Sequence, residues 1–178
     1  MSRIGGRPIK IEDGVNMSIS GSKISANFEN KMLELTLPKI LTAKEENGAI
    51  IVNRADDSKE ARSQHGLFAR LIKNLIHGVK EGFVRELTFT GTGYRVAVSG
   101  EDVLLNMGYS HEIKLAIPKE ISVEVKKNSI FVKGASKEAV GQFAALIRSV
   151  RGPEVYKGKG IKYKEEIIKR KAGKKAAS

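Results

Sequence analysis

The residues that point most clearly to a binding function are the four tyrosines of this chain, each of which lies next to a glycine, a cation or an imidazole in the sequence. They occur in Gly93-Tyr94-Arg95, Gly108-Tyr109-Ser110-His111, Tyr156-Lys157-Gly158 and Lys162-Tyr163-Lys164. Aromatic faces stack on unpaired bases, and Lys or Arg neutralises phosphate, so this interleaving is typical of surfaces that bind folded RNA. Packing of tyrosine at the rim of a sheet is the alternative, and it is strongest for Tyr94 and Tyr109.

An enzyme is the competing class, but the sequence does not assemble a catalytic site. It contains no Cys and three His. His65 and His77 lie more than three turns apart on one predicted helix, which is too far for them to share a metal ion. Neither Gly91-Thr92-Gly93 nor Gly158-Lys159-Gly160 is followed by the Ser or Thr that holds magnesium in a phosphate loop. We therefore expect no catalytic residue, no metal site and no cofactor.

The positive charge of the chain is concentrated at its C-terminal end. The 178 residues include 32 Lys and Arg against 20 Asp and Glu, a net charge of +12, and ten of these cations face only three acids from Arg151 onward. Residues 154–178 are therefore predicted to be a basic arm, in which Gly158 and Gly160 let the backbone approach a phosphate closely. We expect the arm to be mobile until it binds RNA. A solubilising tail without a partner is the alternative.

The helices and strands that carry these residues can be predicted from an internal duplication of the sequence. Leu37-Pro38-Lys39 recurs as Ile117-Pro118-Lys119, and Ser58-Lys59-Glu60-Ala61 recurs as Ser136-Lys137-Glu138-Ala139. The matching segments occur in the same order in both halves, about 80 residues apart, which indicates two related domains rather than a solenoid.

Each half combines alternating apolar residues, typical of strands, with one helical pattern. In the first half, strands are predicted between Val15 and Leu37 and over residues 49–54. A helix follows, with Ser58 as its N-cap and Gly78 or Gly82 at its end. The predicted fold class is α+β: two duplicated small domains, each an antiparallel-rich sheet packed against one helix, plus the arm. The domain boundaries are 1–82, 83–153 and 154–178.

Several longer motifs match one known family. They are His65-Gly66-Leu67, Gly78-Val79-Lys80-Glu81-Gly82-Phe83, Gly93-Tyr94-Arg95, Gly108-Tyr109-Ser110-His111, Val140-Gly141-Gln142 and Tyr156-Lys157-Gly158-Lys159-Gly160-Ile161-Lys162-Tyr163. By these motifs the chain resembles the universal large-subunit ribosomal protein six family, of bacterial type. The resemblance implies two domains of one fold, without catalytic activity or cofactor. It also implies a structural component of the large subunit that binds large-subunit rRNA, near the stalk base and the factor-binding region.

The same resemblance sets the expected partners and location. The partners are large-subunit rRNA and neighbouring ribosomal proteins, with translation factors nearby. Neither a membrane nor a homo-oligomer is implied, and the location is the ribosome in the cytoplasm. The sequence departs from the family pattern at Phe28-Glu29-Asn30-Lys31-Met32, where a Gly-Pro-Lys-Gly turn is usual, and at Gly152-Pro153-Glu154-Val155, which predicts a less stiff start to the arm.

The predicted rRNA-binding residues lie mainly in the second half and the arm. They are Arg3, Tyr94, Arg95, Ser110, His111, Arg151, Tyr156, Lys157, Gly158, Lys159, Gly160, Lys162, Tyr163, Lys164, Lys169, Arg170, Lys171, Lys174 and Lys175. Two other functions stay open at this point: a stand-alone RNA-binding regulator, and an enzyme acting on nucleic acid.

Overall fold

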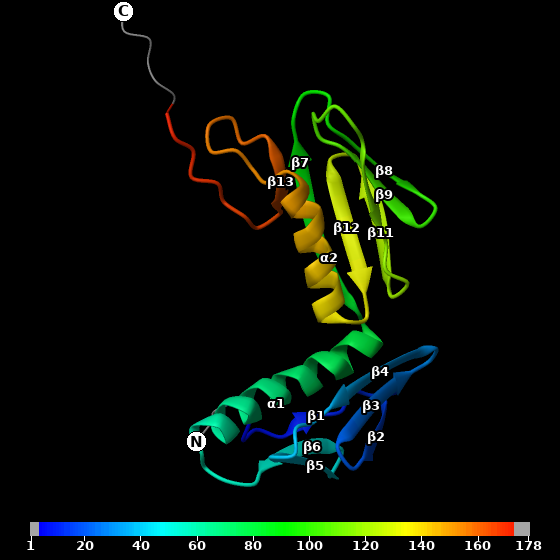
Figure 1. Ribbon diagram of the computed structural model, residues 1–178. Coiled ribbons are helices and arrows are strands. Elements are labelled where there is room, and N and C mark those ends of the chain that lie inside the picture. The colour runs from blue at the N-terminus through cyan, green and yellow to red at the C-terminus, as the bar shows by residue number, and fades with distance from the viewer. Residues whose placement is uncertain (1–3, 173–178) are drawn as a thin grey trace, which may run out of the picture. The chain divides into compact units, whose positions relative to one another are not determined.

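The computed structural model describes residues 4–172 of the chain. Two compact units make up the fold, and the division between them falls between Gly82 and Phe83. Each unit contains two small antiparallel sheets and one helix (Figure 1). No helix within residues 4–172 is long and apolar enough to cross a membrane.

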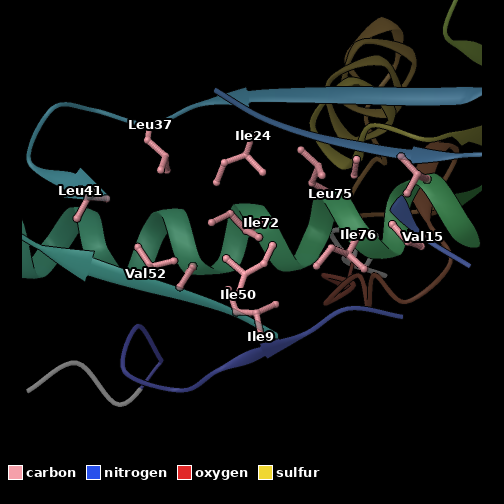
Figure 2. Packing of buried hydrophobic residues seen from close by; sticks show 13 residues of the cluster. Ile9, Val15, Ile24, Leu37, Leu41, Ile50, Val52, Ile72, Leu75 and Ile76 are labelled. Carbon is pink, nitrogen blue, oxygen red and sulfur yellow. The ribbon is translucent and has the colours of Figure 1, made fainter. Parts of the chain in front are cut away.

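The first unit places one helix against two three-stranded sheets. The first sheet has the order β1-β6-β5, with β1 at Ile9–Lys10, β6 at Ala49–Arg54 and β5 at Leu41–Glu46. The second has the order β2-β3-β4, with β2 at Asn16–Ser20, β3 at Lys23–Phe28 and β4 at Lys31–Thr36. Helix α1 spans Lys59–Lys80. Figure 2 shows Ile24 and Ile50 approaching Ile72 of the helix from opposite sides, and all three are fully buried.

Both ends of α1 follow from local sequence. The Ser58 side chain accepts a hydrogen bond from the Ala61 amide at 3.1 Å, which satisfies one of the free donors in the first turn. At the other end Gly82, with φ +76°, donates from its amide to the His77 carbonyl. A left-handed glycine just past the last turn is a common helix stop. The predicted N-cap and the predicted end at Gly82 are confirmed.

The second unit repeats this plan. One sheet has the order β11-β12-β7-β13, with β11 at Ile121–Lys126, β12 at Ser129–Gly134, β7 at Phe83–Thr90 and β13 at Gly160–Tyr163. The other has the order β10-β9-β8, with β10 at Ile113–Ala116, β9 at Asp102–Asn106 and β8 at Arg95–Ser99. Helix α2 spans Lys137–Val150. Its buried side chains share a core with Leu87, Leu105 and Ile130.

The topology confirms the duplication expected from the sequence. The order β1-β6-β5 in the first unit corresponds to β7-β12-β11 in the second, and β2-β3-β4 corresponds to β8-β9-β10. Even a turn is repeated: the Leu41 amide donates to the Pro38 carbonyl, and the Ile121 amide donates to the Pro118 carbonyl, both at 2.9 Å. The predicted α+β class with two related domains is correct.

Within residues 4–82 no strand corresponds to β13, and the sequence did not predict this strand. The charge pattern predicts that these four residues belong to a mobile arm, but they pair antiparallel with β7, and Ile161 is fully buried opposite Phe89. The expectation that the whole arm stays mobile until it binds RNA is therefore wrong for Gly160–Tyr163. The physical reason is the alternation of Ile161 and Tyr163 with lysine, which gives this short stretch one apolar face.

Candidate nucleic-acid interface

The first cluster of the interface is built around Arg151, the residue directly after α2. Its guanidinium carbon lies 5.6 Å from the ring centre of Tyr94 and 5.1 Å from that of Tyr109. Arg151 also donates from Nη1 to the Met107 carbonyl at 2.8 Å. The Tyr109 hydroxyl donates to the Val150 carbonyl at 3.0 Å, at the end of the helix. Arg151 is thus committed to an internal cation–π and hydrogen-bond network that fixes both rings.

Two glycines make room for this cluster. A Cβ atom on Gly91 would lie 2.5 Å from the Tyr94 ring, and one on Gly108 would lie 3.2 Å from Tyr94 and 3.3 Å from Arg151. Gly108 also has φ +78°, in the left-handed region that side chains rarely adopt. Gly91-Thr92-Gly93, which resembles a fragment of a phosphate loop, therefore serves aromatic packing in this structure.

His111 and Ser110 extend the same cluster outward. The imidazole of His111 is exposed and lies 6.5 Å from the Tyr109 ring, at an interplanar angle of 29°. Tyr109 itself is 45% exposed. A planar ring that is held in place and half open to solvent, beside cations, is suited to stack on a base. Tyr94 is instead packed against the core of the second unit, as the rim alternative expects.

A second cluster surrounds Tyr163 on β13. The guanidinium groups of Arg85 and Arg148 lie 5.3 and 5.6 Å from its ring centre. Arg148 also donates to both carboxylate oxygens of Glu166, at 2.8 and 2.5 Å, and the Tyr163 amide donates to the same carboxylate at 3.2 Å. The hydrogen bonds from Arg148 hold the pKa of Glu166 below its ordinary value. This cluster fastens the chain after β13 to the end of α2.

The loop before β13 is shaped by glycine. The Glu154 amide donates to the Lys159 carbonyl at 2.8 Å, and the Thr90 hydroxyl donates to the Gly158 carbonyl at 2.9 Å. Gly160 has φ +132°, and a Cβ atom there would lie 2.5 Å from the Gly152 carbonyl oxygen. These glycines therefore allow a close passage of backbone against backbone, in addition to any role toward phosphate.

The chain beyond β13 folds back onto this loop. The Lys171 amide donates to the Val155 carbonyl at 2.9 Å, and the Arg170 guanidinium lies beside Gly158, 3.2 Å from where a Cβ atom would stand. Cations that are far apart in the sequence are thereby gathered over one loop. Within the described part of the chain, the cationic side chains of this group make no ion pair; they are Lys157, Lys159, Lys169, Arg170 and Lys171.

The structure thus distinguishes three kinds of predicted site residue. Tyr156 and His111 are exposed and open to a partner, as are Arg95, Ser110 and the unpaired cations named above except Lys159, which is half-buried. Lys164 is held by Glu86, with Nζ 2.6 Å from the carboxylate, and this hydrogen bond lowers the pKa of Glu86. Lys162 and Tyr163 are half-buried on β13. Three predicted residues lie outside the described part of the chain: Arg3, Lys174 and Lys175.

Sequence reasoning missed the two arginines that cover Tyr163. Arg85 lies on β7 and Arg148 in the last turn of α2, and their partners are separated from them by many residues in sequence. Tyr109 belonged to a recognised motif but was not among the predicted contacts. A basic residue in the last turn of a predicted helix was the one available signal for Arg148.

Among the described residues, one cluster has ligand atoms close enough together to bind a metal ion. Ligand atoms of Glu12, His77 and Glu81 lie within 4.8 Å of one another. Glu12 is also 3.4 Å from the Lys80 ammonium, and all of these side chains are partly exposed. We assign it no role beyond an ion-pair network at the end of α1.

The architecture and the clusters together define a class: a duplicated α+β protein whose second unit gathers aromatic rings and unpaired cations around its last strand. Comparison with known proteins agrees with this class and narrows it. The family model described as "Ribosomal protein L6" matches residues 11–82 and 90–164, which is most of both units.

Curated relatives match over nearly the whole length of both chains. The chain is 46% identical over 175 residues to "Large ribosomal subunit protein uL6" of Gloeothece citriformis, with 98% of each chain covered. It is equally 46% identical, with 98% of each covered, to the protein of that name from Natranaerobius thermophilus. It is 47% identical, again with 98% of each covered, to "Large ribosomal subunit protein uL6c" of Trieres chinensis. The chain belongs to the ribosomal protein L6 family, whose members are structural and not enzymes.

Proposed function

We propose that this chain is a structural component of the large ribosomal subunit that binds large-subunit rRNA through its second unit and the segment after α2. The observation that carries the proposal is the group of unpaired cations over the loop at residues 153–160. Backbone hydrogen bonds from the Glu154 and Lys171 amides hold this group together, and the hydrogen bond from the Thr90 hydroxyl to the Gly158 carbonyl ties the loop to β7. The family membership and the names of the relatives support the ribosomal setting.

Phosphate neutralisation supplies most of the affinity in this proposal. Each contact releases condensed counterion, so binding weakens with salt by a log–log slope of roughly −0.7 to −0.9 per phosphate. With about six contacts, affinity falls roughly a thousandfold between ~50 and ~200 mM salt. Specificity comes from the shape of the folded RNA and from bases that stack on exposed rings such as Tyr109 and Tyr156.

We further propose a division of labour along the chain. Residues 83–153 form the folded platform, and residues 154–178 form the rRNA-binding arm, which β13 anchors to that platform. The first 82 residues form the sister domain. The chain acts as a monomer within the particle, in the cytoplasm, and supports the stalk base and the region where translation factors bind.

Co-sedimentation tests the proposal against a stand-alone RNA-binding regulator. A ribosome component stays with large subunits at near-stoichiometric level through a high-salt wash. A regulator separates from them under that wash and leaves a large free pool. Recovery of the chain mainly in the free fraction overturns the proposed function.

A further inference from the structure

The first unit contains a groove of about 450 Å³ between the N-terminal segment and α1. Four cationic side chains line it: Arg7 and Lys10 from the N-terminal segment, and Arg70 and Lys73 from the helix. All four are exposed. None of the predicted rRNA-binding residues within residues 4–172 lines this groove, so the functional assignment above leaves it unexplained.

The fold dictates that these cations face the same space. Ile9 of β1 is buried and pairs with Ile50, so its neighbour Lys10 points away from the core. Arg70 and Lys73 lie three residues apart on α1, which brings them to one face of the helix. Ala69, one residue before Arg70, is buried and forms part of the apolar floor.

The groove carries an excess of positive charge that the protein does not neutralise. None of the four cations makes an ion pair within residues 4–172. Among the described residues, Glu12 is the one acid that lines the groove, and the Lys80 ammonium lies 3.4 Å from its carboxylate. Like charges around a concave surface raise the local potential and attract an anionic partner.

We propose that this groove is a second RNA contact, which binds phosphates of the RNA backbone independently of the C-terminal segment. The inference rests on the proposed function, because RNA is the polyanion that a large-subunit protein meets. Long, exposed side chains on two separate elements suit a row of phosphates better than one small anion, which would need donors fixed in a buried pocket. The apolar floor offers a surface for the sugar faces between phosphates.

The test compares two double variants of the full chain in binding deproteinised large-subunit rRNA across a salt series. Arg70→Ala with Lys73→Ala removes two groove cations. Lys59→Ala with Arg62→Ala removes two exposed cations from the start of the same helix, outside the groove. All four positions are exposed, so both variants keep their fold, and circular dichroism melting checks this.

The groove pair is expected to flatten the log–log salt slope by about 1.4–1.8. It should weaken binding by about 25- to 60-fold at ~0.1 M salt, whereas the helix-start pair changes either quantity little. If both variants lose affinity for rRNA equally, the loss reflects net charge only, and the proposal that the groove binds RNA is wrong. If the groove variant binds rRNA as tightly as the unaltered chain, and the unaltered chain binds normally, the groove proposal is wrong while the proposed function stands.

Two remaining outcomes also count against the inference. If the groove pair weakens binding to polyglutamate but not to rRNA, the groove serves an acidic protein segment instead. If the unaltered chain ignores rRNA at low salt, the proposed function fails together with the groove.

Discussion

Ile161→Ala tests most sharply whether the segment after α2 belongs to the folded unit. The side chain is fully buried and lies in the same core cluster as Leu87 and Ile147. Replacing a buried Ile by Ala costs about 2–5 kcal/mol, from lost transfer free energy and the cavity left behind. For a unit of this size even the lower figure corresponds to a melting temperature lower by at least about 8 °C.

The assay is urea unfolding of the full chain, followed for the transition of the second unit. Ile167→Ala is the matched control, because Ile167 is 90% exposed and the same three carbon atoms are removed only six residues away. Its free energy of unfolding should stay within about 0.5 kcal/mol of that of the unaltered chain. If Ile161→Ala also stays within that range, β13 is not part of the core, and the original expectation of a mobile arm is restored.

Hydrogen exchange gives an independent view of the same question. The Ile161 amide donates to the Arg151 carbonyl at 2.8 Å, and the Lys164 amide donates to the Glu86 carbonyl at 3.1 Å. Both amides should be protected in the free protein, before any RNA is present. Rapid exchange at these two positions would contradict the reasoning even if the stability measurement were ambiguous.

Four further outcomes follow from the structure. Gly160→Ala should destabilise the second unit by more than about 1 kcal/mol, because its φ is +132° and its Cβ atom would lie 2.5 Å from the Gly152 carbonyl oxygen. Gly141→Ala, on α2 with open space around it, should stabilise by about 0.5–1 kcal/mol; thermal melting of both variants checks the opposite signs. The pKa of Glu166 is lowered by Arg148, so this pair stabilises the fold above the ordinary value of 4.5 and the contribution is lost as pH falls through the folded pKa. Glu166→Gln should therefore cost about 0.5–1.5 kcal/mol at pH 7 and less at pH 3, and equal losses in urea unfolding at the two pH values would contradict this. A chain that ends at Glu166 keeps β13 and should melt normally, yet without the five cations beyond that point its salt slope for rRNA should flatten by up to about 3.5–4.5. An unchanged slope would mean that those cations make no phosphate contacts.

The truncation point matters because the arm is not one uniform segment. Removal of residues 155–178, which is nearly the whole predicted arm, would also remove β13 and Ile161 from the second unit. Loss of incorporation after that deletion would then report unfolding as much as lost RNA contacts. A chain ending at Glu166 separates the two effects, since the Arg148–Glu166 pair is kept.

The sequence predicted the elements whose signals are local. Helix α1 shows a long amphipathic period, a Ser58 cap and a Gly82 stop, and the repeated motifs carry the duplication. Strands such as β5 were missed because Leu41–Glu46 is mostly polar, and Leu41 is the one buried residue in it. An edge strand of this kind is defined by its neighbour rather than by its own composition.

The interface was predicted in composition but not in its internal contacts. The sequence places Lys157 and Lys159 beside Tyr156, and within residues 4–172 neither lysine makes an ion pair, although Glu154 lies on the same loop. Tyr163 is predicted from the sequence as an rRNA contact, but its contacts with Arg85 and Arg148 are not, because these guanidinium groups reach the ring only through the packing of the sheet and helix. Tertiary contacts between residues far apart in sequence leave no periodic signal.

The most direct test of the central claim uses the absence of cysteine from the chain. Lys157→Cys, carrying a tethered iron chelate, can be assembled into large subunits and used to generate hydroxyl radicals at that position. We expect cleavage of the rRNA at a limited set of nucleotides close to this loop. If every large subunit contains the labelled protein and its rRNA is still not cleaved, the proposed rRNA contact is contradicted, because the cationic segment would then face away from the RNA.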